Sequence, residues 1–242
     1  MVKRLFDFIL SLLLILVFLP ILILFSFLIW NQDKNSPFYI APRVGKDKKL
    51  FKMIKFRSMI VNADKTGVDS TSSDDDRITK LGDFIRKYKI DELPNFFNII
   101  LGQMSFVGPR PNVERETILY TKEESNLLNV RPGITDFSSI VFSDEGEILE
   151  GADDPDLKYN QLIRPWKSRL GLFYVKNQSI WLDINLILLT AISIFSRQTS
   201  LSWIKRTLVK LNAEKNLIKV ASRSDKLEPY PPPGASKVVT GR

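Results

Sequence analysis

The sequence predicts a helix-rich α+β monotopic membrane protein. We expect one re-entrant N-terminal membrane helix and a small cytosolic domain with interfacial amphipathic helices. Three observations support this fold class. The 26 residues from Leu5 to Trp30 are almost all apolar. Later segments combine helical apolar spacing with short strand-like pieces, and 44% of all residues are hydrophobic. Basic residues flank both ends of the apolar run, as expected if both ends face the cytoplasm.

The apolar run is a membrane segment and not a signal peptide. A signal peptide has an apolar core of about 7–15 residues followed by a small-residue cleavage site, and the sequence shows neither. A straight helix of this length would measure about 39 Å, more than the roughly 30 Å hydrocarbon core. Pro20 predicts a kink, so two arms could enter and leave by one face. This hairpin is favoured over a tilted span, which remains the alternative.

Two residue types are missing, and their absence limits the chemistry. The 242 residues include no cysteine and no histidine. This excludes disulfides, thiolate metal sites, a histidine base and a Ser-His-Asp triad. Any metal would be a hard cation held by oxygen atoms, such as Mg²⁺ or Ca²⁺. The net charge of +8 suits phosphorylated ligands, anionic membranes or nucleic acid.

Two adjacent carboxylates, Asp91 and Glu92, stand just ahead of a predicted helix. Pro94 precedes the apolar run Phe96–Leu101, which stops at Gly102. Proline is common in the first turn of a helix and glycine commonly ends one, so the acids are predicted at a helix N-terminus. Partial positive charge there favours ionised carboxylates and bound anions. Taken alone, such a pair more often only stabilises the start of the helix.

Three basic side chains are candidates for contact with phosphate. Arg110 lies between two prolines, whose fixed φ angles pre-organise it, and its planar fork matches phosphate. Lys55 and Arg57 lie in a basic segment predicted as a short strand or an interfacial piece. That segment could contact phosphate or lipid headgroups, or it could be a solvated basic edge. A helix with one apolar face is predicted over residues 77–88 and contains Arg86.

A second apolar run, Ser179–Phe195, is short for a membrane span and has Trp181 near its start. An interfacial helix or a core helix fits it better than a second crossing. The predicted division of the chain is a membrane helix over 1–35, a main domain over 36–205 and a C-terminal extension over 206–242. The extension is rich in proline and is predicted to be partly disordered.

Five motifs occur in an order that resembles one protein family. They are Lys55-Phe56-Arg57-Ser58-Met59, Asp76-Arg77-Ile78-Thr79, Asp91-Glu92-Leu93-Pro94, Met104–Pro111 and Arg131–Thr135. Each motif is weak alone, but together, from Lys3 to about Leu189, they resemble the bacterial sugar transferases, the monotopic phosphoglycosyl transferases. The resemblance implies transfer of a sugar 1-phosphate from a UDP-sugar to undecaprenyl phosphate, with release of UMP. This would be the first membrane step in the synthesis of O-antigen, capsule or glycoprotein glycans.

The same resemblance implies roles for single residues. Asp91 would be the nucleophile that forms a phosphosugar-aspartyl intermediate, and Glu92 would assist at the metal or in proton transfer. Asp91 and Glu92 would bind Mg²⁺, and Arg86 and Arg110 would bind substrate phosphate together with Lys55 and Arg57. The catalytic domain would lie on the cytoplasmic face of the bacterial inner membrane, in contact with membrane lipids.

One segment departs from the family pattern. After Arg-Pro-Gly-Ile-Thr, many members continue with Gly and a Gln-Val-Asn-Gly-Arg-like segment, whereas this chain reads Asp136–Val141. The resemblance therefore identifies no particular sugar. A non-catalytic membrane-anchored scaffold, or an anionic-lipid-binding protein, is the alternative function. No nucleic acid is expected as a partner, because the basic residues are scattered and the membrane segment would be unexplained.

Overall fold

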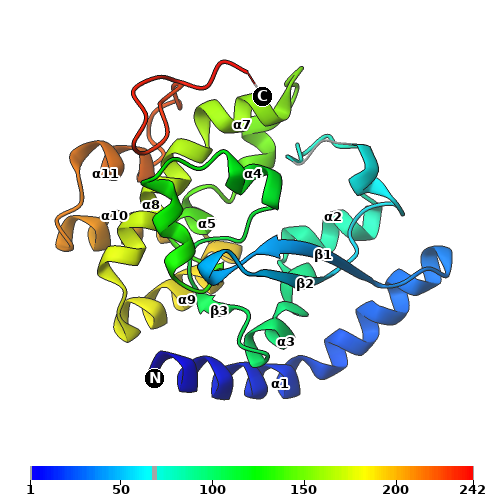
Figure 1. Ribbon diagram of the computed structural model, residues 1–242. Helices are drawn as coiled ribbons and strands as arrows, with labels where there is room; N and C mark the ends of the chain where they lie inside the picture. Colours follow the sequence, from blue (N-terminus) through cyan, green and yellow to red (C-terminus); the bar gives the residue numbers. More distant parts are fainter. Residues whose placement is uncertain (1, 67–69, 242) are drawn as a thin grey trace.

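The computed structural model describes residues 2–66 and 70–241, and it confirms a helix-rich protein with little sheet (Figure 1). The helical body lies along one side of the long N-terminal helix α1, Val2–Asp33. Within the described residues, α1 is the one helix long and apolar enough to cross a membrane. It continues through Pro20 as a single helix, and Figure 1 shows that it changes direction near α3.

The start of α1 is fastened to the body by its two basic residues. Lys3 Nζ lies 2.5 Å from Asp183 Oδ2 and also donates to the carbonyl of Val107 at 3.1 Å. Arg4 donates to the carbonyl of Ile100 at 2.6 Å. These contacts join α1 to three separate elements of the body, so its first turn is fixed in place.

The end of α1 is fastened to the same body. The carboxylate of Asp33 accepts hydrogen bonds from both terminal nitrogens of Arg57, at 2.5 and 2.6 Å. In its second half, one face of the helix contributes Leu22, Phe25 and Ile29 to a small hydrophobic core. Phe56 and Ile85 of the body complete this core. Its other faces leave large apolar side chains exposed, among them Leu5, Leu16, Ile23 and Phe27.

Two short sheets occur in the described residues. The first is an antiparallel hairpin of β1, Phe38–Val44, and β2, Leu50–Phe56, closed by the 3₁₀ turn η1, Lys46–Lys48. The second pairs β3, Ser105–Val107, in parallel with β4, Gly133–Thr135. A Cβ atom on Gly133 would lie 2.1 Å from the backbone nitrogen of Gly108, so this close approach requires glycine. The strand predicted for the basic segment is confirmed as β2.

The helix predicted over 77–88 begins later, as α2, Lys80–Lys87. Thr79, itself extended, caps it by accepting from the backbone N–H of Gly82 at 2.9 Å. Before it, residues 76 and 77 form a turn and Ile78 pairs with Met59 as an isolated bridge. The helix predicted after Pro94 is confirmed as α3, Asn95–Ile100, and Gly102 follows with φ of +78°.

The remaining described elements are mostly short helices around one core. They are η2 Ala63–Thr66, η3 Ile90–Glu92, α4 Glu114–Ile118, η4 Glu124–Asn129, α5 Phe137–Val141, α6 Glu145–Leu149, α7 Pro155–Leu162, α8 Arg164–Asn177, α9 Ile180–Phe195, α10 Arg197–Lys210 and α11 Lys215–Ala221.

The second apolar run forms α9, which is partly a core helix. Leu182, Leu186 and Leu189 are buried in the main core, whereas Trp181 and Phe195 at its two ends are 78% and 89% exposed. Each fully buried leucine stabilises the fold by roughly 1.5–3 kcal/mol. The helix therefore secures the body while its ends present large apolar side chains to the surroundings.

The C-terminal region is in contact with the body. The expected boundary at residue 205 falls inside α10, whose Leu201, Ile204 and Leu208 are buried in the main core. The proline-rich segment after α11 also packs, with the ring of Tyr230 centred 4.5 Å from that of Trp166. Composition alone predicts disorder there, but aromatic contacts give this segment a fixed place.

Candidate active site

The two acids lie together in η3, directly ahead of α3. Lys89, just before them, has φ of +58°, which turns the chain sharply between α2 and η3. Asp91 and Glu92 are each only 8% exposed. The predicted position of the pair before the proline-opened helix is confirmed. Two adjacent carboxylates at this burial need compensating charge or protonation.

Glu92 receives that compensation from two cations. Its Oε1 accepts from Arg110 Nη2 at 2.8 Å and from Lys55 Nζ at 3.2 Å. Burial alone would raise the pKa of Glu92, but the charges of Arg110 and Lys55 hold it well below its usual value. The charge of Glu92 in turn raises the pKa of Arg110. Burial, together with the charge of Arg110, lowers the pKa of Lys55.

Asp91 is different because its Oδ1 is buried and has no hydrogen-bond partner among the described residues. Burial raises the pKa of Asp91, and the charge of Lys55 opposes that shift. A buried carboxylate oxygen without a partner is costly, so it is a candidate for contact with a ligand, a metal or a reacting atom. The structure thus separates the two acids: Glu92 is paired and Asp91 is available.

A buried asparagine that sequence reasoning missed positions Lys55. Asn98 of α3 accepts from the backbone N–H of Ile54 at 3.0 Å and donates to the carbonyl of Lys52 at 2.7 Å. These bonds hold β2 against α3 at the residues just before Lys55, whose side chain reaches Glu92. The available signal was a polar residue inside the apolar run Phe96–Leu101.

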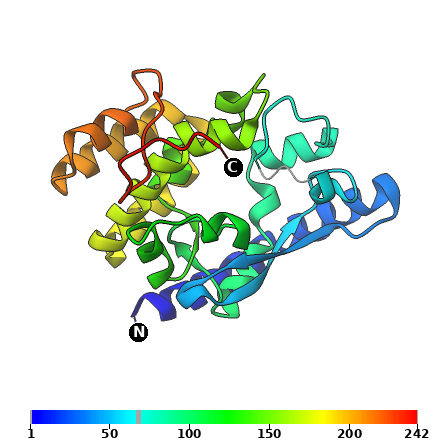
Figure 2. The same cartoon turned by 45° about the horizontal axis from the view of Figure 1, so that its top comes forward.

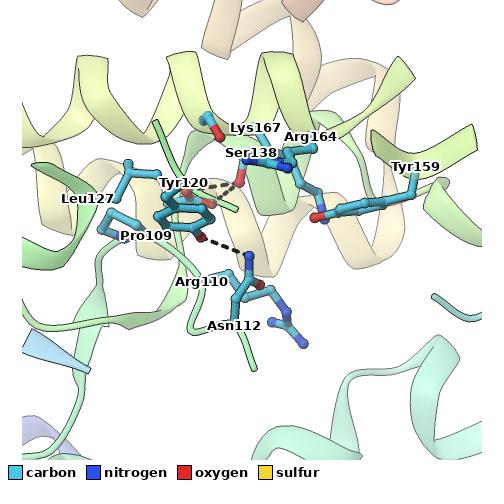
Figure 3. A pocket seen from close by; sticks show the side chains of 11 residues that line it. Pro109, Arg110, Asn112, Tyr120, Leu127, Ser138, Tyr159, Arg164 and Lys167 are labelled. Atoms are coloured by element: carbon cyan, nitrogen blue, oxygen red, sulfur yellow. Dashed lines mark hydrogen bonds between the residues drawn. The ribbon is translucent and has the colours of Figure 1, made fainter. Parts of the chain in front are cut away.

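Arg110 joins the acidic pair to a polar pocket. Its side chain, 37% exposed, contacts Glu92 and also lines an open polar pocket. Figure 3 shows Pro109, Arg110 and Asn112 on one side of this pocket, with Arg164 and Lys167 of α8 on the other. Tyr120, Leu127, Asp136, Ser138, Tyr159 and Ser168 complete the lining.

The pocket side chains are held by one another. Asn112 donates to the hydroxyl of Tyr120 at 2.9 Å, and Ser138 donates to Asp136 at 2.8 Å. Lys167 pairs with Glu145. Asp136 and Ser138 belong to the segment that departs from the family pattern, so that departure lies in the pocket wall.

The other two predicted phosphate contacts lie elsewhere. Both terminal nitrogens of Arg57 are occupied by Asp33 at the end of α1. Arg86 lies on α2, and no hydrogen bond or ion pair between it and either acid occurs in the part of the chain that the structure describes. The pKa of Asp75 is lowered first by its hydrogen bond from Arg77 and also by the charge of Arg86. Of the four predicted cations, Lys55 and Arg110 reach the pair.

Fold and site together define a protein with a long apolar N-terminal helix and a buried acidic pair beside a polar pocket. The model of the bacterial sugar transferase family matches residues 1–197. The chain therefore belongs to this family, and the resemblance found in its motifs is confirmed.

Named relatives act on different sugars. The chain is 33% identical over 203 residues to a UDP-galactose-lipid carrier transferase of Erwinia amylovora, which covers 78% of this chain and 39% of that protein. It is 32% identical to a UDP-N-acetylgalactosamine-undecaprenyl-phosphate N-acetylgalactosaminephosphotransferase of Aeromonas hydrophila. That match covers 78% of this chain and 42% of the relative. It is 34% identical to a UDP-glucose:undecaprenyl-phosphate glucose-1-phosphate transferase of Klebsiella pneumoniae. That match covers 82% of this chain and 41% of the relative. The chain thus spans about two fifths of the length of these relatives.

Replacing each acid by its amide is expected to change thermal stability in opposite directions at pH 7 without divalent cations. The folded pKa of Asp91 lies above its ordinary 3.8, so ionised Asp91 destabilises the fold and Asp91→Asn should melt higher. That advantage should shrink as the pH falls through the folded pKa of Asp91. The folded pKa of Glu92 lies below 4.5, so ionised Glu92 stabilises the fold above that pH. Glu92→Gln should melt lower because Lys55 and Arg110 lose their counter-charge.

The measurement is a melting curve in detergent with EDTA at several pH values. One kcal/mol corresponds to about 2–4 °C for a chain of this size. Glu147→Gln, at an exposed position of α6, is the matched control and should melt like the wild type. Shifts of the same sign for Asp91→Asn and Glu92→Gln would contradict the assigned difference between the acids.

Proposed function

We propose that the protein transfers a sugar 1-phosphate from a UDP-sugar to undecaprenyl phosphate and releases UMP. The reaction takes place at the cytoplasmic face of the bacterial inner membrane, as the first membrane step of glycan synthesis. Family membership and the activities for which the relatives are named support the reaction class. The main structural support for this reaction is the buried, unpartnered Oδ1 of Asp91 near the cations Lys55 and Arg110, which both pair with the neighbouring Glu92.

The first step uses ionised Asp91 as a nucleophile. Its carboxylate oxygen attacks the phosphorus that carries the sugar, a new O–P bond forms, and the bond to UMP breaks with its electron pair leaving on UMP. In the second step a phosphate oxygen of undecaprenyl phosphate attacks the same phosphorus and displaces Asp91. An activated carboxylate is an established type of nucleophile for phosphoryl groups, and no histidine is needed.

Glu92 and its two cations prepare the site for anionic substrates. Lys55 and Arg110 are held in place by Glu92 before any substrate arrives. Pre-positioned cations stabilise charge that develops on phosphoryl oxygens without reorganisation. Because Arg110 also lines the polar pocket, a UDP-sugar bound there would place its diphosphate toward Asp91.

Asp91 and Glu92 could supply part of the coordination shell of a Mg²⁺ ion. Within the described residues no three acids gather into a metal site, but Mg²⁺ is often held by one or two carboxylates plus substrate phosphates. The unpartnered Oδ1 of Asp91 is a suitable hard ligand, and Glu92 lies beside it. When bound, Mg²⁺ would neutralise charge on the diphosphate.

The attachment of both ends of α1 to one body supports a re-entrant arrangement. A spanning helix would separate Lys3 from Asp33 by the roughly 30 Å hydrocarbon core. Their partners Asp183 and Arg57 belong to the same folded body. Helix α3, which follows the acidic pair, lies directly against α1. The site therefore faces lipid headgroups, where the phosphate of a lipid acceptor is found.

Replacing Asp91 by Asn should lower UMP release by at least about a hundredfold, because the neutral amide is no nucleophile. Lys55→Ala and Arg110→Ala should each reduce it by about 10²–10³-fold. The assay contains mixed UDP-sugars, undecaprenyl phosphate and Mg²⁺. Lys52→Ala, at an exposed position of the same strand, is the control and should keep wild-type turnover.

Normal turnover by Asp91→Asn would refute the nucleophile assignment. A wild-type protein that binds anionic lipid vesicles but releases no UMP with any UDP-sugar would instead favour the scaffold or lipid-binding function.

The re-entrant arrangement predicts that both flanks of α1 are cytoplasmic. Because the chain contains no cysteine, Val2→Cys and Ser36→Cys each supply one unique thiol at an exposed position. A membrane-impermeant maleimide should label neither variant in intact spheroplasts and both after lysis. Labelling of either position in intact spheroplasts would show that α1 spans the membrane.

A further inference from the structure

Asn95, the first residue of α3, is a buried polar side chain without an assigned role. It is only 1% exposed. Its Oδ1 has no hydrogen-bond partner among the described residues, and its amide nitrogen forms no hydrogen bond with them either. Exchanging the oxygen and the nitrogen of the amide would therefore leave the oxygen equally free. A buried polar group without a partner is costly, so a ligand that satisfies it is expected.

Asn95 follows Asp91 by about one helical turn. The helical backbone is not interrupted between η3 and α3, because Leu93 and Pro94 both have right-handed helical φ and ψ angles. The backbone N–H of Phe96 donates to the carbonyl of Leu93 at 3.1 Å across this junction. Side chains four residues apart on a helix share one face, with Cβ atoms about 5–6 Å apart. Asp91 and Asn95 are therefore neighbours.

Strand β2 covers the same face of the helix. It lies beside η3 and α3 in both views of the molecule (Figure 1 and Figure 2). Asn98, three residues after Asn95, bonds to the backbone of β2 through both its side-chain oxygen and its nitrogen. Asp91, Asn95 and Asn98 thus form a polar row toward the strand. In the described part of the chain, Asn98 is the one member of this row with side-chain hydrogen bonds.

The two free oxygens of the row indicate the kind of ligand. Asp91 Oδ1 and Asn95 Oδ1 are both acceptors, so they attract a cation or a hydrogen-bond donor and repel a phosphate oxygen. The nearby cations Lys55 and Arg110 are paired with Glu92 instead. Carboxylate and amide oxygens are typical ligands of hard divalent cations.

We propose that Asn95 Oδ1 and Asp91 Oδ1 are two ligands of one divalent cation, Mg²⁺. The inference rests on the proposed function and adds a neutral oxygen to the acids that could hold the metal there. A neutral ligand satisfies the cation without placing a third negative charge beside the buried acidic pair. Asp91 keeps its second carboxylate oxygen, Oδ2, for the proposed attack on phosphorus.

The test measures cation binding with Mn²⁺, which takes the same oxygen ligands and is followed by the electron paramagnetic resonance of the free ion. The protein in detergent is titrated alone and with UMP. Asn95→Leu, which keeps the approximate shape without polar atoms, should weaken Mn²⁺ binding about tenfold or more. Residues that only orient a metal ligand already change metal affinity by about 10–100-fold. Asn95→Asp, which keeps an oxygen, should bind at least as tightly as the wild type.

The control is Asn216→Leu, at an exposed position of α11, which should bind Mn²⁺ like the wild type. Melting curves add a readout that separates a metal ligand from a structural residue. Without divalent cations, Asn95→Leu should melt higher than the wild type, because a buried unsatisfied amide is removed. Mg²⁺ should then raise the Tm of Asn95→Leu less than that of the wild type.

Equal Mn²⁺ affinity of Asn95→Leu and the wild type would overturn the proposal, and is the result expected if the amide holds only a water molecule. An Asn95→Leu variant that melts lower and keeps the full Mg²⁺ shift would show a structural role and overturn it too. So would a wild type that binds no Mn²⁺, either alone or with UMP. A wild type that binds Mn²⁺ but releases no UMP from any UDP-sugar would refute the proposed function separately.

Discussion

The structure of the site depends on one interaction, the buried ion pairing of Glu92 with Arg110 and Lys55. It joins three parts of the chain, the strand β2, the turn η3 and the loop after β3. It also decides which acid is free, because the paired carboxylate satisfies the two cations and leaves Asp91 Oδ1 without a partner. Two equivalent acids would share the cations, and neither would be reserved for an incoming group.

The position of this cluster depends on α1. Ion pairs at both ends of α1 and the packing of α3 against it make this apolar helix part of the folded body. Arg4 donates to the last carbonyls of α3, where the helix leaves backbone acceptors without internal partners. The long apolar helix α1 therefore also supports the helix that follows the acidic pair.

Local signals predicted the local features. Proline and glycine marked the two ends of α3, the apolar run marked α1, and the adjacent acids were found where they were expected. Partners in space were less accessible: Arg57 looked like Lys55 in sequence, yet one pairs with Asp33 and the other with Glu92. The ion-pair partner of a side chain on a strand depends on which residues the fold places near it. The same reason hid Asn98, whose bonds cross between elements, and the packing of Tyr230 against Trp166, in a segment whose composition predicts disorder.

The most direct test of the account asks whether Asp91 becomes covalently linked to the sugar phosphate. The wild-type protein is incubated with its UDP-sugar and Mg²⁺ but without undecaprenyl phosphate, then denatured and measured by intact mass spectrometry. We expect an added sugar phosphate that peptide mapping places on Asp91, that undecaprenyl phosphate removes, and that Asp91→Asn lacks. Turnover of UDP-sugar with lipid, but with no added mass at any time or with the mass on another residue, would contradict it.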